Sequence, residues 1–510
     1  MASTISLIPY PISLIEKKGF FNIRNNAVVV SNCFDENLDS IIKSLLLKVG
    51  LECNFSTSNP DILLNSSDSY KEYSLKDNES YCVDINSENI SIYASGKAGI
   101  FYAFESLVQL LITYKKNIPC LSIYDKPAYK WRGFLLDTSR SFYTVDFIKK
   151  VLDLCAFHKL NTFHWHLTDD QGWRFPVEGY PLLTEIGGKR LAPRKPKVME
   201  GLNEDNSYRR RYYTEEEIKD IVKYADDRFI NIVPEVDIPG HSSALLASYP
   251  EFGCTGGPYQ VEHRWGVFSD ILCAGNDNIF KIYDAVFASL EKLFPGKYVH
   301  IGGDECRTTR WEKCPKCQQR MKDENLDNTN QLQSWVTKKM VELLEKHGKI
   351  PIGWDEVLEN TEKIPVPEDL IVQSWRGTEG GEKAVKLNHN VIMSPHYMTY
   401  VNYKPYDNFE EPGMLDVITI EKSYTFSPVT EGMSEEDSHL VMGGECALWT
   451  EELRSSRMAE YLMFPRLCAI AECLWLKKSD KDYNRFLNNL NEHKKRLDYL
   501  DVLYYKGPAK

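Results

Sequence analysis

Two adjacent carboxylates, Asp304 and Glu305, follow a short apolar run that ends at Ile301. Such a run is typical of a buried strand, and the glycines at 302 and 303 let the backbone turn sharply or approach a ligand closely. Acids directly after a buried parallel strand lie where barrel enzymes keep their catalytic groups. A solvated loop that happens to carry two acids explains these residues equally well on their own, so the rest of the chain has to decide.

Eight short apolar runs alternate with amphipathic helical patterns from residue 132 onward. The runs are 133–138, 162–167, 230–236, 298–301, 350–354, 370–375, 391–394 and 441–449, and helical patterns include 145–158, 215–227, 278–293 and 332–347. This alternation predicts an α/β fold, a (β/α)8 TIM barrel with room for loop insertions. An open, doubly wound sheet is the alternative, and it is disfavoured because no glycine-rich dinucleotide loop follows a first strand.

The segment before the barrel has the pattern of a small α+β domain. Strands are expected at 5–9, 27–31 and 90–95, and helices at 38–49 and 98–111. We expect one domain at 1–126 and a catalytic barrel at 127–510, joined by a linker at 125–131 and completed by a helix at 480–500 that lies on the barrel. The small domain carries no acid cluster, metal-ligand spacing or glycine loop, so its predicted role is structural.

The composition limits the kinds of partner. A net charge of −12 argues against nucleic-acid and anionic-membrane partners, because either would need a basic face. No stretch approaches the roughly 20 apolar residues of a membrane span. The N-terminal segment lacks the basic start and apolar centre of a signal peptide, so we expect either a cytoplasmic protein or an exported form whose leader has been removed. The 10 Trp and 29 Tyr suit ring-shaped ligands such as sugars, although most aromatic residues form core.

The 13 cysteines are an odd number, so at least one is a free thiol or makes an intermolecular bond. Cys254 and Cys273 flank one loop region and are placed to bridge. Cys314-Pro-Lys-Cys317 is half of a zinc knuckle, but no second Cys-x-x-Cys or His pair completes it. We interpret it as a loop with free thiols, or at most a local structural bond.

Polar and aromatic residues end nearly all eight runs. They occupy 137–140, 164–170, 234–241, 304–305, 354–356, 374–376, 400–402 and 449–451. Each could be a strand end that meets water. Together, on the face where barrel enzymes work, they indicate an active site.

Five stretches resemble glycoside hydrolase family 20, the β-N-acetylhexosaminidases. They are Arg132-Gly-Phe-Leu-Leu-Asp-Thr-Ser-Arg140, Phe163-His-Trp-His-Leu-Thr-Asp-Asp-Gln-Gly-Trp173, Pro239-Gly-His241, His300-Ile-Gly-Gly-Asp-Glu305 and Gly443-Gly-Glu-Cys-Ala-Leu-Trp449. They span the predicted barrel in the family's order, and the small domain resembles the family's usual N-terminal partner.

The resemblance implies a mechanism that the acid pair suits. Neighbouring Cα atoms lie about 3.8 Å apart with diverging side chains, so Asp304 and Glu305 are poorly placed to straddle a glycosidic bond as an acid and a nucleophile do. In the family the substrate's 2-acetamido oxygen attacks instead, forming an oxazolinium intermediate with retention. By this analogy Glu305 is the general acid and then the base, and Asp304 orients the acetamido N–H. We expect burial beside Asp304 to raise the pKa of Glu305.

The resemblance assigns a hydrogen-bonded chain and a sugar clamp. Asp169 and His241 match residues that position the catalytic Glu; without the resemblance His241 would be a satisfied loop histidine. Arg140 resembles the arginine that binds the 3- and 4-hydroxyls of the terminal sugar. A salt bridge with Asp137 is its structural alternative.

Further positions resemble the pocket that holds the sugar. Tyr400 corresponds to the tyrosine that donates to the acetamido oxygen, and Asn402 and Glu451 to positions that bind the outer hydroxyls. The residues that resemble the aromatic box are Trp354, Trp375 and Trp449. Core packing is the alternative for all four aromatic residues. Many relatives have Asp at the position of Asn402, which leaves recognition of the 6-position open.

Two other functions fit parts of the pattern. His164-x-His166, with His241 and Asp304, resembles a metal site of a metal-dependent amidohydrolase that deacetylates amino sugars. A non-catalytic sugar-binding protein would keep the aromatic residues without needing both acids. The function we predict is exo-acting, retaining hydrolysis of terminal, non-reducing β-linked GlcNAc or GalNAc from oligosaccharides or glycoconjugates, with no cofactor or metal, by a monomer or homodimer. The loops at 188–211 and 405–412 are expected to set linkage and sugar preference.

Overall fold

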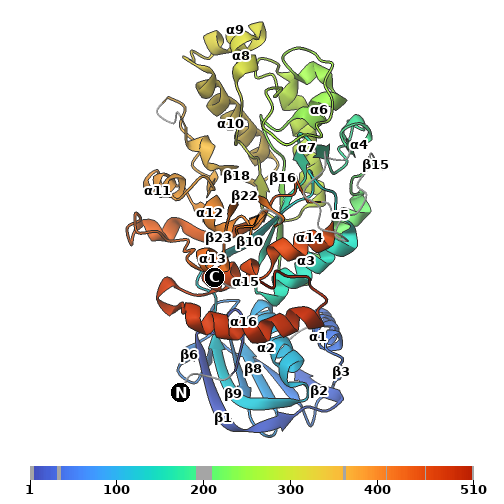
Figure 1. Ribbon diagram of the computed structural model, residues 1–510, viewed down its shortest axis with the longest axis vertical. Helices are drawn as coiled ribbons and strands as arrows, with labels where there is room; N and C mark the ends of the chain where they lie inside the picture. Colours follow the sequence, from blue (N-terminus) through green and yellow to red (C-terminus); the bar gives the residue numbers. More distant parts are fainter. Residues whose placement is uncertain are drawn as a thin grey trace.

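The computed structural model describes residues 5–31, 36–190, 209–359, 363–408, 411–453 and 455–507. It contains a seven-stranded mixed sheet near the N-terminus and a closed, eight-stranded parallel barrel (Figure 1). This confirms a TIM barrel preceded by a small α+β domain. None of the helices in these ranges is long and apolar enough to cross a membrane.

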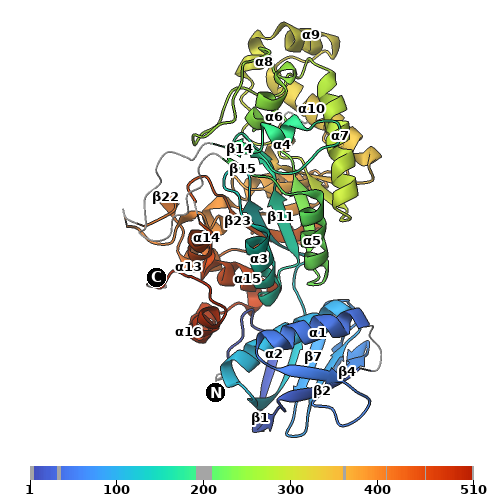
Figure 2. The same cartoon turned by 90° about the vertical axis from the view of Figure 1, so that its right-hand side faces the viewer.

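The small domain is a sheet with helices on one face. Its strands, in spatial order, are β1 (Ser13–Asn22), β9 (Asn117–Asp125), β7 (Tyr81–Ile85), β8 (Ile90–Ala94), β4 (Ile62–Ser66), β2 (Asn26–Ser31) and β3 (Glu52–Phe55). Helices α1 (Glu36–Lys48) and α2 (Lys97–Tyr114) lie between this sheet and the barrel (Figure 2). Helix α2 is buried without a break from Ala98 to Ile112 and is mostly apolar, as expected of a helix packed on both faces.

The predicted strand at 5–9 is wrong. This segment is irregular, because its backbone is paired with a side chain instead of a strand. The backbone N–H of Ile8 donates to Oε1 of Gln109, and Nε2 of Gln109 donates to the carbonyl of Ile8. The first strand begins later, at Ser13, and its mostly exposed polar residues gave no apolar run to detect.

All eight predicted barrel strands are present. In spatial order they are β10 (Trp131–Asp137), β11 (Thr162–His166), β16 (Asn231–Glu235), β17 (Tyr298–His300), β18 (Ile350–Trp354), β19 (Ile371–Ser374), β20 (Val391–Met393) and β23 (Val441–Leu448). The predicted helices are also present, as α3 (Val145–Phe157), α5 (Glu215–Asp226), α7 (Asn278–Leu293) and α10 (Thr329–Lys346). Helix α3 begins where the Thr144 side chain accepts from the Phe147 N–H, and Thr214 and Glu217 form a capping box at α5.

Side chains fill the barrel in layers, which places the site at one end. An apolar layer that includes Trp131, Val233 and Ile352 closes the amino-terminal end. At the carboxyl end, Trp354 and Tyr400 belong to a second apolar cluster, and both of these residues line a cavity. Buried polar residues lie between these layers and support the groups above them.

Helix α16 (Tyr483–Tyr499) lies across the junction of the two domains, and not on the barrel alone as predicted. Arg496 donates through Nη2 to the carbonyl of Ser6 at 2.7 Å and through Nε to the carbonyl of Gln109 at 3.1 Å. On the barrel side, His493 meets His158 with 2.9 Å between their Nε2 atoms. The helix therefore joins the N-terminal segment, α2 and α3.

Candidate active site

The turn after β17 aims the two adjacent acids. Gly302 and Gly303 have φ angles of 67° and 106°, which glycine adopts readily. A Cβ on Gly302 would lie 1.8 Å from Oδ1 of Asp237, so no larger residue fits there. The Gly303 N–H donates to the same oxygen at 3.2 Å. This contact fixes the turn that carries Asp304 and Glu305 into a cavity at the carboxyl end of the barrel.

The cavity has a volume of about 290 Å³, and nine of the eleven predicted site residues line it. They are Arg140, Asp304, Glu305, Trp354, Trp375, Tyr400, Asn402, Trp449 and Glu451. The other two, Asp169 and His241, lie directly behind Glu305: Asp169 is hydrogen-bonded to His241, and His241 forms an ion-pair contact with Glu305. Residues that end or follow six barrel strands thus meet in one pocket, and residues that follow the other two strands lie behind it.

The chain behind the acids centres on His241. Its Nδ1 lies 3.1 Å from Oδ1 of Asp169, and its Nε2 lies 3.6 Å from Oδ2 of Asp304 and 3.5 Å from Oε2 of Glu305. Burial alone would lower the pKa of His241, but the Asp169 carboxylate outweighs it and raises this pKa well above its usual value. A positive imidazolium therefore stands behind both acids.

Arg140 is held by several acceptors at the rim of the cavity. Its Nη2 lies 2.6 Å from Oδ2 of Asp169, and its Nε donates to Oε1 of Gln171 at 3.0 Å. Its contact with Asp137 is longer, 3.5 Å, and the guanidinium also lies 5.2 Å from the ring centre of Trp449. The salt bridge to Asp137 considered from sequence is thus secondary to the pair with Asp169.

Aromatic side chains form one wall of the cavity. Tyr400 and Trp375 stack at 6.3 Å with nearly parallel rings, and Trp449 lies 6.0 Å from Trp354 and 6.1 Å from Tyr400. The Trp354 indole is anchored from below, since its Nε1 donates to Oε1 of Glu235 at 2.9 Å. The wall offers flat apolar surfaces of the kind that stack on a sugar ring or enclose a methyl group.

Several buried polar atoms of the cavity have no hydrogen-bond partner in the described part of the chain. They are Oδ1 of Asp304, Oδ1 of Asn402, Oε2 of Glu451 and Nε1 of Trp449. Buried polar groups are normally paired, because leaving one unpaired costs about 1–3 kcal/mol. Their grouping in one cavity indicates a ligand rich in hydroxyl or amide groups.

The prediction that the pKa of Glu305 is raised is wrong, and it is Asp304 whose pKa is raised. Burial raises the pKa of Asp304 well above its usual value, with the Asp237 carboxyl adding to the effect. Burial also acts to raise the pKa of Glu305, but its contact with His241 outweighs burial, so this pKa is lowered. The expectation failed because the acids differ in exposure: the Glu305 side chain is 40% exposed and the Asp304 side chain 14%.

The barrel histidines considered as metal ligands are engaged by carboxylates. His166 contacts Glu235 through Nδ1 and Asp169 through Nε2, and His164 contacts Glu445 through Nδ1 and Glu235 through Nε2. These contacts use both ring nitrogens of each histidine. The pair therefore supports the floor of the cavity.

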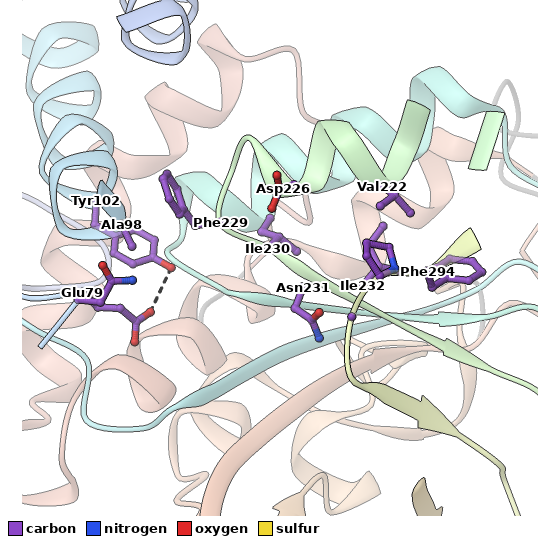
Figure 3. A pocket seen from close by; sticks show the side chains of 13 residues that line it. Glu79, Ala98, Tyr102, Val222, Asp226, Phe229, Ile230, Asn231, Ile232 and Phe294 are labelled. Carbon is purple, nitrogen blue, oxygen red and sulfur yellow. Dashed lines mark hydrogen bonds between the residues drawn. The ribbon is translucent and has the colours of Figure 1, made fainter. Parts of the chain in front are cut away.

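A larger cavity of about 410 Å³ lies elsewhere, at the junction of the small domain with the amino-terminal end of the barrel (Figure 3). Its charged residues are Glu79 and Asp226, and Glu79 accepts a hydrogen bond from the Tyr102 hydroxyl at 3.3 Å. Its lining contains neither two adjacent acids nor a tryptophan. We therefore place the chemistry at the smaller cavity.

Family models match both parts of the chain. The model described as glycosyl hydrolase family 20, catalytic domain, matches residues 129–478, and the model described as domain 2 of that family matches residues 4–126. The chain belongs to glycosyl hydrolase family 20. The family 20 catalytic match contains every barrel strand and all eleven predicted site residues.

Similar proteins cover most of this family 20 chain. A beta-hexosaminidase of Porphyromonas gingivalis is 35% identical over 98% of this chain, which spans 64% of that protein's length. A beta-hexosaminidase of Akkermansia muciniphila is 32% identical over 82% of this chain and 85% of its own length. The crystal structure of the exo beta-N-acetylglucosaminidase of Vibrio harveyi, in complex with N-acetylglucosamine, matches with a TM-score of 0.87 and 28% identity, covering 99% of this chain and 80% of that one.

Other residues in or near the family 20 site were not among the eleven predicted. Glu356 and Asp237 follow strands that were recognised, and their position after those strands was the available signal; burial raises their pKa values to about 8 and about 7. Trp265 and Asp416 line the cavity. Trp265 comes from an irregular stretch and Asp416 from the short strand β22 (Met414–Val417), and neither element was expected from the sequence. Of the two loops expected to set specificity, residues 191–208 and 409–410 lie outside the described ranges.

Proposed function

We propose that this family 20 chain is an exo-acting, retaining β-N-acetylhexosaminidase that removes terminal β-linked GlcNAc or GalNAc from oligosaccharides or glycoconjugates. The observation that carries the proposal is the adjacent pair Asp304–Glu305, both in reach of His241, at one side of a cavity with an aromatic wall. The names of the similar proteins support the same reaction. We also propose the division into a structural domain, 1–126, and a catalytic domain, 127–510.

In the first step, the acetamido oxygen of the substrate attacks its own anomeric carbon. Glu305, in its acid form, gives its proton to the glycosidic oxygen, so the bond to the leaving group breaks and an alcohol departs. An oxazolinium ion remains. Asp304 accepts from the acetamido N–H and its negative charge offsets the positive charge that develops there, while the Tyr400 hydroxyl donates to the acetamido oxygen.

In the second step, the Glu305 carboxylate takes a proton from water, and the resulting hydroxide adds to the anomeric carbon and opens the oxazolinium ring. Two displacements at one carbon retain the β configuration. Asp169 and His241 act as positioning residues, because they hold the Glu305 carboxyl without touching the sugar. Binding of a sugar would bury the exposed part of Glu305, which raises its pKa toward the acid form that the first step needs.

The remaining residues of the cavity would hold the sugar. Arg140 is fixed to donate to the outer hydroxyls, and Asn402 and Glu451 offer unpaired oxygens at the same cavity. The tryptophans Trp354, Trp375 and Trp449 would enclose the acetamido methyl and one face of the ring.

A set of nitrophenyl sugars tests the proposal. The chain should release nitrophenol from the β-N-acetylglucosaminide and the β-N-acetylgalactosaminide, and hardly from the β-glucoside, which lacks the acetamido group. Proton NMR should show the β-anomer of the free sugar first. Efficient cleavage of the β-glucoside would point to a protein nucleophile. Release of acetate with the nitrophenyl group still attached would favour the deacetylase, and binding without any turnover would favour a sugar-binding protein.

Two variants test the roles of the acids. Glu305→Gln should lower kcat by about 10²–10⁴-fold, since the amide can neither give nor take the proton. Asp304→Asn should also lower kcat for the acetamido substrates. Normal turnover by either variant would refute the role given to that residue.

A further inference from the structure

Four cysteines from three segments of the chain gather beside the active-site loops. Cys254 follows a 3-10 turn, Cys273 follows the loop that begins there, and Cys314 and Cys317 lie at the start of α9 (Pro315–Asp323). Their sulfur atoms all lie within 4.8 Å of one another. Three of the four residues are buried and Cys254 is half-buried, and none of them is in a disulfide.

The distances between the sulfurs match a tetrahedral metal site. The Cys254–Cys317 sulfurs are 3.8 Å apart, and those of Cys273 lie 3.7 Å from both Cys314 and Cys317. In a tetrahedron with zinc–sulfur bonds of about 2.3 Å, the sulfurs are about 3.8 Å apart. A disulfide would need about 2.0 Å, so two bridges do not describe this arrangement.

The backbone around the sulfurs is built to hold them in place. Gly253 and Leu272 form an antiparallel bridge next to the two loop cysteines, and the Cys273 N–H donates to the Phe252 carbonyl at 2.8 Å. Gly275 packs so closely on the backbone of 316–317 that a Cβ there would lie 2.2 Å from the carbonyl carbon of Lys316. The two halves of the cluster are thus locked together by main-chain contacts.

We propose that Cys254, Cys273, Cys314 and Cys317 bind one structural Zn²⁺ ion. Four thiolate ligands in a tetrahedron are a set that zinc prefers, and a site with four protein ligands has no open position for catalysis. One Zn²⁺ and four thiols give a complex of net charge −2 and release four protons. The half knuckle at 314–317 is completed by two single cysteines 19 positions apart, which a search for a second pair could not find.

The site would serve the active site by anchoring a loop. Cys254 and Cys273 stand at the two ends of the loop that brings Trp265 and Val267 to the wall of the sugar cavity. Cys314 lies ten positions after Asp304, and helix α9 lies at the end of the molecule farthest from the small domain (Figure 1). The ion would therefore fix the Trp265 loop to the segment that follows the catalytic acids.

Metal analysis of the purified chain tests the site independently of its activity. Protein expressed with zinc in the medium and purified without chelator should contain one zinc per chain by mass spectrometry. Cys273→Ser and Cys317→Ser should each lose it, whereas Cys53→Ser, which changes a half-buried cysteine of the small domain, should keep it. Retention of zinc by both site variants would overturn the proposal.

Cobalt substitution gives an answer even where a variant fails to fold. Wild-type protein exchanged into Co²⁺ should show the strong visible bands of tetrahedral cobalt and the near-ultraviolet bands of sulfur ligation. Zinc removal should lower the melting temperature by roughly 5 °C or more, and zinc should restore it. Wild-type protein that binds neither zinc nor cobalt would refute the site, as would disulfides among these four cysteines by peptide mapping.

Discussion

Glu305 and His241 share an unusual backbone conformation, with φ angles of 48° and 46°. A left-handed conformation costs a residue with a Cβ about 1–2 kcal/mol, and such strain gathers at functional sites. The two residues are in contact, with 3.5 Å between Nε2 of His241 and Oε2 of Glu305. The strained turns therefore hold the imidazolium and the proposed proton donor together.

This strain predicts a stability difference between two inactive variants. Glu305→Gly should be more stable than Glu305→Ala by roughly 1 kcal/mol or less, because glycine relieves the left-handed strain but has a more disordered unfolded chain. Urea unfolding of both variants measures the difference. If the alanine variant is the more stable one, the strain at this position is negligible.

The pKa order of the two acids predicts how the pH profile of kcat/KM should divide. In the proposed first step Asp304 must be ionised and Glu305 protonated. Because Asp304 has the higher pKa of the two, this combination is a minor form of the free protein. The fall of kcat/KM at high pH, the upper limb of the profile, then reports the pKa of Asp304. Asp237 is the neighbouring charge that raises the pKa of Asp304 most. Asp237→Asn removes this charge and keeps an oxygen for the Gly303 N–H, so the upper limb should move to lower pH.

The matched control for this profile is Asp416→Asn. Asp416 also lines the cavity, but it is not among the main charges that act on Asp304. In Asp416→Asn, the pH at which kcat/KM falls on the alkaline side should be the same as in the wild type. An unchanged upper limb in Asp237→Asn, or a shift of equal size in both variants, would assign that limb to another group.

At the residue scale, sequence reasoning located the acids but not their protonation. Asp304 and Glu305 were identifiable because a specific motif follows a strand with a clear apolar pattern. Their pKa order depends on how deeply each carboxyl is buried and on which of them His241 approaches, and neither follows from residue order. Trp265 was missed because a loop residue reaches the cavity only through the path of the folded chain.

At the element scale, the barrel strands were predictable because strands buried on both faces are nearly continuous apolar runs. Every residue of β10 is buried, for example. The strand β1 was missed because it lies at the edge of the sheet, with most of its residues exposed. The position of α16 was predicted only in part, since its charged surface gives no sign of the buried contacts that Arg496 and His493 make.

The contact of α16 with α3 predicts a loss of stability in acid. Burial lowers the pKa of His158 from 6.5 to about 4, and it also lowers the pKa of His493 well below its usual value. The unfolded chain therefore binds these protons first, so the stabilisation is complete above pH 6.5 and is lost as the pH falls toward 4. His158 alone accounts for about 3 kcal/mol over this range.

Urea unfolding at a series of pH values measures this effect. His493→Gln keeps a hydrogen-bonding side chain next to His158 but removes one buried group that titrates, so its stability should fall less steeply below pH 6.5. The control His439→Gln changes an exposed histidine and should follow the wild-type curve. Equal slopes in all three proteins would show that the buried pair does not govern acid stability.

At the scale of the whole molecule, buried charges join the small domain to the barrel. Asp125, at the end of β9, accepts from Lys159 at 2.9 Å, from the Tyr81 hydroxyl at 2.7 Å and from the Trp475 indole at 2.8 Å. Arg132, at the start of β10, lies 2.6 Å from Glu79 of the small domain. The linker between the domains is therefore anchored at both ends, and we expect the two to unfold together.

The Asp125–Lys159 pair gives the test of this coupling. Lys159→Met leaves Asp125 buried without its cation, and losing one partner of a buried ion pair costs about 3–5 kcal/mol. The cost should lie near the lower end, because Tyr81 and Trp475 still donate to the carboxylate. The double variant with Asp125→Asn removes the stranded charge and should recover part of the loss, while kcat stays near the wild-type value because the pair lies away from the sugar cavity. Calorimetry should show one transition in each protein. Two separate transitions in the wild type would mean that the domains unfold independently. If the stability losses of Lys159→Met and of Asp125→Asn alone simply add up in the double variant, the domains are not coupled through this pair.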